Sequence, residues 1–234
     1  MAARTGHLIL AFLFVAALSA VALTRKKPQR PKARRPPAIL PSRPVTFDET
    51  ALRLAIRDSA FRFVGLLESP GRDNRAPWLD ELNAGTGFPI GSRYCAIGLY
   101  RAYLVAGVRL PVSAPGRVNA YFLDADRIIY RRNAQLHYSR EPQRMDWVSL
   151  FESHVEAYDE PSGWLQRGID SDRALDKQDA EDQLRERRVW LIGYNTSGGR
   201  GTREGVYRNK RKVKDIKKIA NHLTPFLKAW PKSR

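Results

Sequence analysis

The sequence predicts an α+β fold in which helices come first along the chain and an antiparallel sheet follows. In the first half, apolar residues recur at helical spacing over 52–67 and again over 96–106. In the second half, apolar and polar residues alternate over 146–151 and 154–158, which is typical of strands with one buried face. Because the two kinds of element are segregated along the chain, α+β is favoured over an alternating α/β arrangement.

The length and the charge distribution predict one globular body with basic appendages. A chain of 234 residues has room for one well-buried domain. Its net charge of +17 is concentrated in residues 24–44, with eight Lys/Arg and no acid, and in residues 208–234, with ten Lys/Arg and one Asp. The body between these segments is close to neutral, so a nucleic-acid-binding body is not predicted. The single cysteine excludes an internal disulfide.

Residues 1–23 are predicted to be a signal peptide or a membrane anchor. An uncharged apolar run occupies residues 7–23, behind Arg4, and Ala20-Val21-Ala22 resembles a small-x-small cleavage site. The basic segment that follows conflicts with export, because positive charges tend to stay on the cytoplasmic side. We expect a cell-envelope location outside the cytoplasm, secreted or membrane-anchored, and the sequence leaves the membrane orientation open.

Residues 24–45 are predicted to be an extended, semi-stiff linker. The segment mixes Lys and Arg with six prolines and cannot build a core. Such basic segments suit an anionic membrane or wall polymer, which is the expected partner of the linker and of the C-terminal tail. A solvated, repulsive spacer is the alternative. No specific nucleic-acid partner is expected.

The domain itself is predicted to span residues 46–212 and to begin with helices. Thr46-Phe47-Asp48-Glu49 has the form of a capping box ahead of an amphipathic helix that runs to Leu67. A short helix is expected over 78–83. A buried helix is expected from the Cys95 region to Gly107, where glycine supplies the stop signal.

The second half is predicted to supply the strands. We expect strands over 118–121, 128–130, 146–151, 154–158, 189–194 and 205–208, with a flexible loop after residue 194. A solvated helix is expected over 170–188. Residues 213–234 are expected to form a basic C-terminal helix, mainly over 216–230, with an apolar face.

Cys95 is the candidate nucleophile. It lies in the first turn of its predicted helix, where unpaired N–H groups and the helix dipole favour an anion such as a thiolate. The alternative is a small buried hydrophobic residue, which is the usual state of a free cysteine. A nucleophilic cysteine needs a base and a third polar group that orients it.

His154 and Asn195 are the candidate partners of that cysteine. His7 lies in the leader, His137 in an Arg-rich loop and His222 on the predicted terminal helix. His154 instead opens a strand, where a side chain can be aimed at a helix end, and Asn195 ends a strongly apolar strand. Each has a structural alternative: a histidine that bonds to its neighbours, and an asparagine that forms a turn.

These residues belong to a series of motifs that resembles CHAP-like members of the NlpC/P60 cysteine peptidase superfamily. The resemblance covers about residues 47–212, with the motifs in the order of the family. They are Glu68-Ser69-Pro70-Gly71-Arg72-Asp73-Asn74, Trp78-Leu79-Asp80, Tyr94-Cys95-Ala96 after Gly91, Asp146-Trp147-Val148-Ser149-Leu150-Phe151, Ser153-His154-Val155, Ile192-Gly193-Tyr194-Asn195-Thr196 and Gly205-Val206-Tyr207-Arg208.

The resemblance implies a papain-like domain that hydrolyses amide bonds of peptidoglycan, as an amidase or an endopeptidase. The Cys95 thiolate would attack the carbonyl, His154 would shuttle the proton and Asn195 would orient His154. The Cys95 backbone N–H would help to hold the oxyanion. The resemblance implies no metal and no other cofactor. Tyr94 is expected to flank a groove for glycan and stem peptide.

The chain departs from the family pattern at three places. Tyr94 replaces a common Trp and Ser153 replaces a frequent Gly. Gly193 or Tyr194 stands where many relatives carry Glu, so Asn195 would serve without a carboxylate from that strand. A non-catalytic wall-binding module, or a basic module that binds anionic polymers such as lipid or nucleic acid through its tail, remains the alternative function. The sequence predicts neither the bond cleaved nor the oligomeric state.

Overall fold

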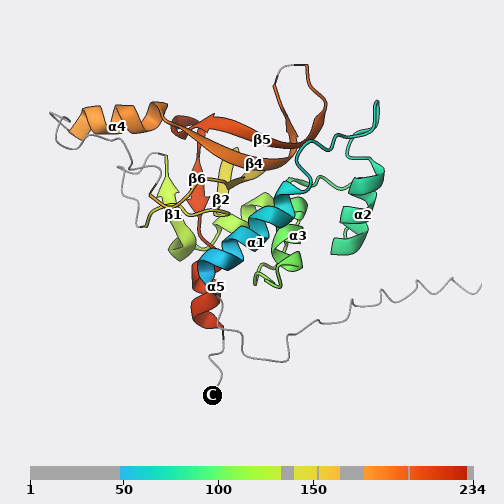
Figure 1. Ribbon diagram of the computed structural model, residues 1–234, viewed down its shortest axis with the longest axis horizontal. Coiled ribbons are helices and arrows are strands. Elements are labelled where there is room, and N and C mark those ends of the chain that lie inside the picture. Colours follow the sequence, from blue (N-terminus) through green and yellow to red (C-terminus); the bar gives the residue numbers. More distant parts are fainter. Residues whose placement is uncertain (1–47, 133–139, 152, 164–176, 200, 231–234) are drawn as a thin grey trace, which may run out of the picture. The chain divides into compact units, whose positions relative to one another are not determined.

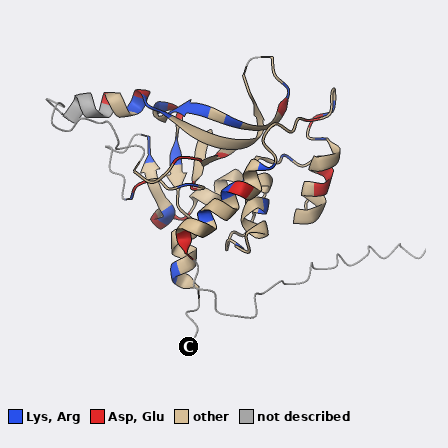
Figure 2. Ribbon diagram, in the orientation of Figure 1, with Lys and Arg blue, Asp and Glu red and all other residues tan. Residues whose placement is uncertain are grey.

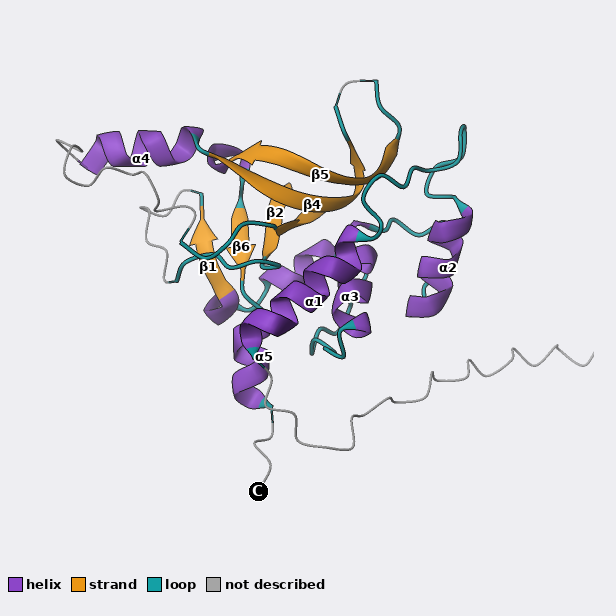
Figure 3. Ribbon diagram, viewed as in Figure 1, coloured by secondary structure: helices purple, strands orange, loops and turns teal. Residues whose placement is uncertain are grey.

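The computed structural model describes residues 48–132, 140–151, 153–163, 177–199 and 201–230. In these residues helices pack against a six-stranded antiparallel sheet, which confirms the α+β class (Figures 1 and 3). The predicted leader 1–23, the whole predicted linker 24–45 and His137 lie outside the described residues. Among the described helices none is both long and apolar enough to cross a membrane.

Three helices form one layer of the fold: α1 (Glu49–Phe61), α2 (Pro77–Thr86) and α3 (Cys95–Val105). The capping box at Thr46 was a wrong expectation, because the N-cap is Asp48, whose carboxylate accepts a hydrogen bond from the Thr50 N–H at 2.9 Å. The first helix also ends before Leu67. Residues 65–68 instead pair with the start of a strand, through hydrogen bonds from Gly65 N–H to Val206 O and from Glu68 N–H to Glu204 O. This non-local pairing competes successfully with the local helical periodicity.

The sheet has the strand order β1-β6-β2-β3-β4-β5, and all neighbours are antiparallel. Its strands are β1 (Ile128–Arg131), β2 (Trp147–Phe151), β3 (His154–Tyr158), β4 (Arg188–Ser197), β5 (Glu204–Lys212) and β6 (Lys218–Ala220). The strand expected over 118–121 is wrong, since Val118–Phe122 is a 3-10 helix. β4 continues past its expected end, with an irregular register between Tyr194 and Thr196.

The C-terminal segment differs most from its prediction. A single helix over 216–230 is wrong, because residues 218–220 form β6 between β1 and β2, and only Leu223–Ala229 form a helix, α5. His222 is buried just before α5, and its Nε2 bonds the carbonyl of Tyr121 at 2.8 Å. The apolar residues of this segment fit helical spacing locally, but the sheet places Ile219 in a buried strand.

Buried residues lie on both faces of the sheet, and strand alternation distributes them. Trp147, Val155 and Ile192 join the cluster that packs on α1, α2 and α3, whereas Val148 and Leu191 join a second cluster that includes Leu184 of α4 (Lys177–Glu186). The helix expected over 170–188 is thus confirmed over α4, and residues 164–176 lie outside the described part. Within the helical layer α3 contacts α1 and α2, and it also packs against β3 and β4 of the sheet.

Basic residues of the C-terminal region belong to the folded domain (Figure 2). Arg208 and Arg211 lie on β5, and their guanidinium groups pair with the fully buried carboxylates of Asp159 at 2.6 Å and Glu156 at 2.7 Å. Lys212 pairs with Glu186 of α4 at 2.6 Å. Part of the charge that the sequence suggested for a tail therefore neutralises acids inside the fold.

Candidate active site

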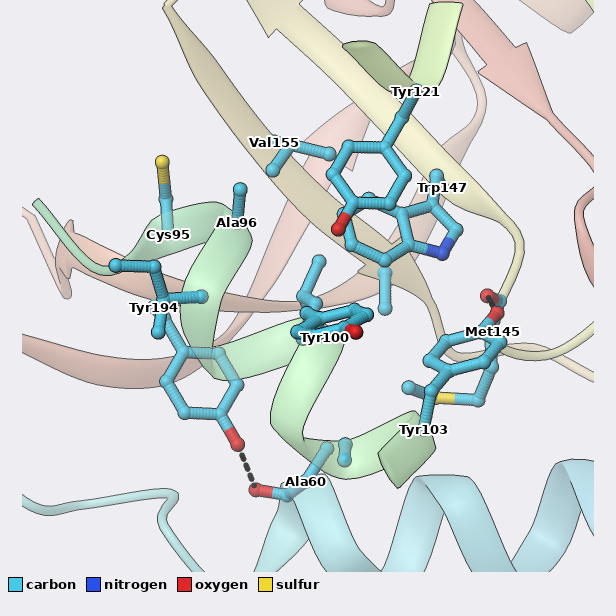
Figure 4. Packing of buried hydrophobic residues seen from close by; sticks show 14 of the residues in the cluster. Ala60, Cys95, Ala96, Tyr100, Tyr103, Tyr121, Met145, Trp147, Val155 and Tyr194 are labelled. Carbon is cyan, nitrogen blue, oxygen red and sulfur yellow. Dashed lines mark hydrogen bonds between the residues drawn. The ribbon is translucent and has the colours of Figure 1, made fainter. Parts of the chain in front are cut away.

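Cys95 is the first residue of α3, so its backbone N–H has no partner within the helix. The first closing hydrogen bond of the helix runs from Gly98 N–H to Tyr94 O at 2.8 Å. Figure 4 shows the Cys95 sulfur at the border of the packed cluster, pointing away from Tyr100 and Trp147. The Cys95 thiol donates weakly to the Ser153 carbonyl at 3.8 Å. The sulfur thus lies beside the β2–β3 turn, at the edge of the buried cluster.

His154 opens β3 immediately after this turn, and its ring has a carboxylate and the Cys95 side chain as neighbours. Its Nε2 is 3.3 Å from Oε1 of Glu156, and its side chain is also within hydrogen-bond reach of Cys95. The β2–β3 register shifts between Ser149 and Phe151, so that Phe151 pairs with His154 at the end of the hairpin.

The contacts of His154 raise its pKa by more than its burial lowers it. Burial by itself lowers the pKa of the imidazole, but the hydrogen bonds to Cys95 and Glu156, together with their negative charges, raise it to about 9. The cationic form of His154 is therefore favoured at neutral pH. An imidazolium beside a sulfur is the arrangement that stabilises a thiolate.

Glu156 is the site residue that sequence reasoning missed. It lies two residues after His154 on β3, its side chain is 0% exposed, and Arg211 donates to both of its oxygens, at 2.7 Å to Oε1 and 3.2 Å to Oε2. Burial opposes ionisation, yet the hydrogen bonds from His154 and Arg211 lower the pKa of Glu156. The signal was available, because residues i and i+2 of a strand share one face.

Asn195 enters the same pocket, but the contact with Nε2 of His154 belongs to Glu156. The Asn195 backbone has φ +53° at the irregularity of β4, and its backbone N–H lies near the hydroxyl of Tyr94. Its Oδ1 is buried and accepts no hydrogen bond from the described residues. The structure thus brings Cys95 and His154 together as expected, with Glu156 where Asn195 was expected to act.

Tyr94 is fully buried, so the expectation that it flanks a substrate groove is wrong. Its ring packs edge-on against Trp78, with centroids 5.6 Å apart and an interplanar angle of 82°. Burial and the nearby Glu68 carboxyl raise the pKa of the Tyr94 hydroxyl. Tyr94 therefore anchors the start of α3 against α2.

A pocket of about 520 Å³ opens beside the Cys95–His154 pair. Cys95 is 5% exposed, and the two residues that it contacts, Ser153 and His154, both line this pocket. Among the described residues, the lining consists of Asp73, Asn74, Arg93, Phe151, Ser153, His154, Asn195, Thr196, Ser197, Glu204 and Arg211. The lining contains both acids and bases, so the pocket suits a polar ligand of mixed charge.

A thiol, an imidazole and a buried carboxylate thus lie near one another, and these are the group types that nucleophilic catalysis by cysteine uses. Within the described residues, no cluster of three or more His, Cys, Asp or Glu side chains is placed to hold a metal ion. No family model matches the chain, and neither the curated proteins nor the solved structures give a significant match.

Proposed function

We propose that the protein is a cysteine hydrolase that cleaves amide bonds of peptidoglycan, with Cys95 as nucleophile, His154 as acid and base, and Glu156 as the group that orients His154. The observation that carries this proposal is that Cys95 bonds the carbonyl of Ser153, the residue before His154, and that the His154 ring bonds the buried Glu156 carboxylate at 3.3 Å. A histidine that only filled space in the core would need neither a thiol nor a carboxylate beside its ring.

The geometry supports a two-step reaction. In the first step the Cys95 thiolate attacks the amide carbonyl carbon, the C–N bond breaks, and the His154 imidazolium gives its proton to the leaving amine. The product is a thioester. In the second step His154 takes a proton from water, the resulting hydroxide attacks the thioester, and the carboxylate product leaves as the sulfur is released. The free Cys95 N–H would stabilise the oxyanion in both steps.

The choice of peptidoglycan rests on the sequence resemblance and is consistent with the pocket. Stem peptides of the cell wall carry amide bonds, carboxylates and amines, and the pocket wall offers both Arg93 and Arg211 and the acids Asp73 and Glu204. A hydrolase tethered by the N-terminal segments would meet this polymer at the cell envelope.

The test uses the full-length chain, purified in detergent, and purified sacculi. We expect the wild-type protein to release soluble muropeptides, and mass spectrometry of these fragments identifies the bond cleaved by its new amine and carboxylate. Cys95→Ala and His154→Gln should release none, because one lacks the nucleophile and the other the proton carrier.

Two controls complete this test. Both variants should unfold cooperatively and should still pellet with sacculi, and His154→Gln should unfold at a lower temperature because it lacks the charged imidazole that stabilises the fold. Release by Cys95→Ala equal to that of the wild type would contradict the proposal. Pelleting without release by the wild type would favour the non-catalytic binding module.

A further inference from the structure

Gly193 lies directly opposite Glu156 in the β3–β4 ladder. Residues directly opposite each other on antiparallel strands point to the same face of the sheet. Gly193 also pairs with Tyr207 on the other side, and its φ is not in the left-handed region. Its backbone is therefore ordinary strand, which any residue adopts, so the conformation of the chain does not require a glycine here.

The space beside Gly193 is filled by the Glu156 side chain. A Cβ atom on Gly193 would lie 2.6 Å from Oε1 of Glu156 and 2.8 Å from both Cγ and Cδ. Oε1 cannot shift freely, because it is bonded to His154 and to Arg211. A side chain at position 193 and the observed Glu156 carboxylate therefore exclude each other.

We propose that positions 156 and 193 share one carboxylate site beside Nε2 of His154, and that Gly193 is a positioning residue that holds this site open for Glu156. This inference rests on the proposed function of the Cys95–His154 pair. It also means that the carboxylate can be supplied from either strand. An aspartate oxygen is two bonds from its own Cβ, which matches the 2.6 Å between the Gly193 Cβ position and Oε1.

Arg211 makes the shared site specific for a carboxylate. Its guanidinium group reaches across from β5, bonds both oxygens of Glu156, and is also held by Oγ1 of Thr196 at 3.2 Å. Because Thr196 provides an anchor independent of Glu156, Arg211 would remain in place to receive a carboxylate from position 193. Its charge would equally favour the ionised form of that carboxylate.

The experiment is a double-mutant cycle on the full-length protein, measured without any cell-wall substrate. The rate of Cys95 alkylation by iodoacetamide between pH 5 and 10 reports on the Cys95–His154 pair, and thermal unfolding reports on the fold. We expect Glu156→Ala and Gly193→Ala each to slow alkylation at pH 6.5 by about tenfold or more, a coupling typical of residues in contact. The double variant Glu156→Ala/Gly193→Ala should be no slower than Glu156→Ala, because the clash has been removed.

The second arm of the experiment moves the carboxylate from position 156 to position 193. Glu156→Ala/Gly193→Asp should restore alkylation at pH 6.5 to within about threefold of the wild type, and should shift the pH profile back as well, since the oxygen returns to His154. A glycine with a merely structural role would change the unfolding temperature but not this pH profile. If Gly193→Ala alone fails to fold, Glu156→Ala must rescue its folding.

Three results would overturn the inference. The first is that Gly193→Ala slows alkylation by the same factor in the wild type and in Glu156→Ala. The second is that Gly193→Asp does not speed alkylation of Glu156→Ala, and the third is that Glu156→Ala does not restore folding to a misfolded Gly193→Ala. Because alkylation needs no sacculi, these results are separate from a failure of the proposed hydrolysis.

Discussion

At the scale of single residues, two buried histidines show how contacts decide protonation. His222 bonds a backbone carbonyl and faces the Arg127 guanidinium, and burial lowers its pKa to about 4. His154 is also mostly buried, but it faces a sulfur and a carboxylate, and its pKa rises to about 9. Burial alone would lower both pKa values, so the difference comes from the neighbours.

The first prediction concerns these two pKa values. NMR titration of the full-length protein should show an imidazole with a pKa near 9 for His154 and one near 4 for His222. Cys95→Ala should lower the pKa of His154, because a raising contact is lost, and should leave His222 unchanged as an internal control. A pKa of about 6.5 for His154 in both proteins would contradict the assigned contacts.

The raised pKa of His154 also predicts how stability depends on pH. A histidine whose pKa is higher in the folded state stabilises that state fully below its unfolded pKa of 6.5, and this contribution disappears as pH rises through about 9. The contribution is on the order of 3 kcal/mol. Chemical denaturation at pH 6 and pH 10 should show this loss in the wild type and a smaller loss in His154→Gln. Equal losses in both proteins would contradict it.

At the scale of the elements, the close approach of α3 to β4 places Cys95 at the sheet. Gly98 is in the middle of α3, and a Cβ there would overlap the ring of Tyr194. Tyr194 in turn bonds the Ala60 carbonyl at 3.2 Å (Figure 4). The absence of a side chain at Gly98 therefore leaves room for the Tyr194 ring between α3 and α1, and this allows α3 to lie close to β4.

The third prediction compares two glycines of the helices. Gly98→Ala should lower the free energy of unfolding by about 1–3 kcal/mol, because overpacking outweighs the better helix propensity of alanine. Gly85→Ala in α2 should raise it by about 0.5–1 kcal/mol, because nothing lies within 4 Å of the new methyl group. Chemical denaturation measures both, and the same sign for the two variants would contradict the packing described here.

The elements that depend on local sequence patterns were predicted, whereas those that depend on pairing between distant residues were not. The start of α3, the β2–β3 hairpin and β4 depend on local periodicity, and their positions were predicted. β6 depends on pairing with β1, about ninety residues earlier, and a local pattern does not contain this information. The same holds for Gly65 to Glu68, whose strand partner lies near Val206.

At the scale of the whole domain, the candidate site is assembled from distant parts of the chain. The loop before α3, the β2–β3 hairpin, the end of β4 and the strand β5 all contribute to one pocket. The sequence predicted Cys95 and His154, because a helix start and a strand start are local features. Glu156 was missed because its role depends on Gly193 and Arg211, which become its neighbours only when β3, β4 and β5 pair.

The most direct test of the central claim is the pH dependence of Cys95 alkylation in the wild type and in His154→Gln. If the imidazolium of His154 stabilises the thiolate, the wild type should react rapidly from pH 6 to pH 8, and His154→Gln should react slowly over the same range. Identical profiles that rise only at alkaline pH, as for an ordinary thiol, would contradict the account.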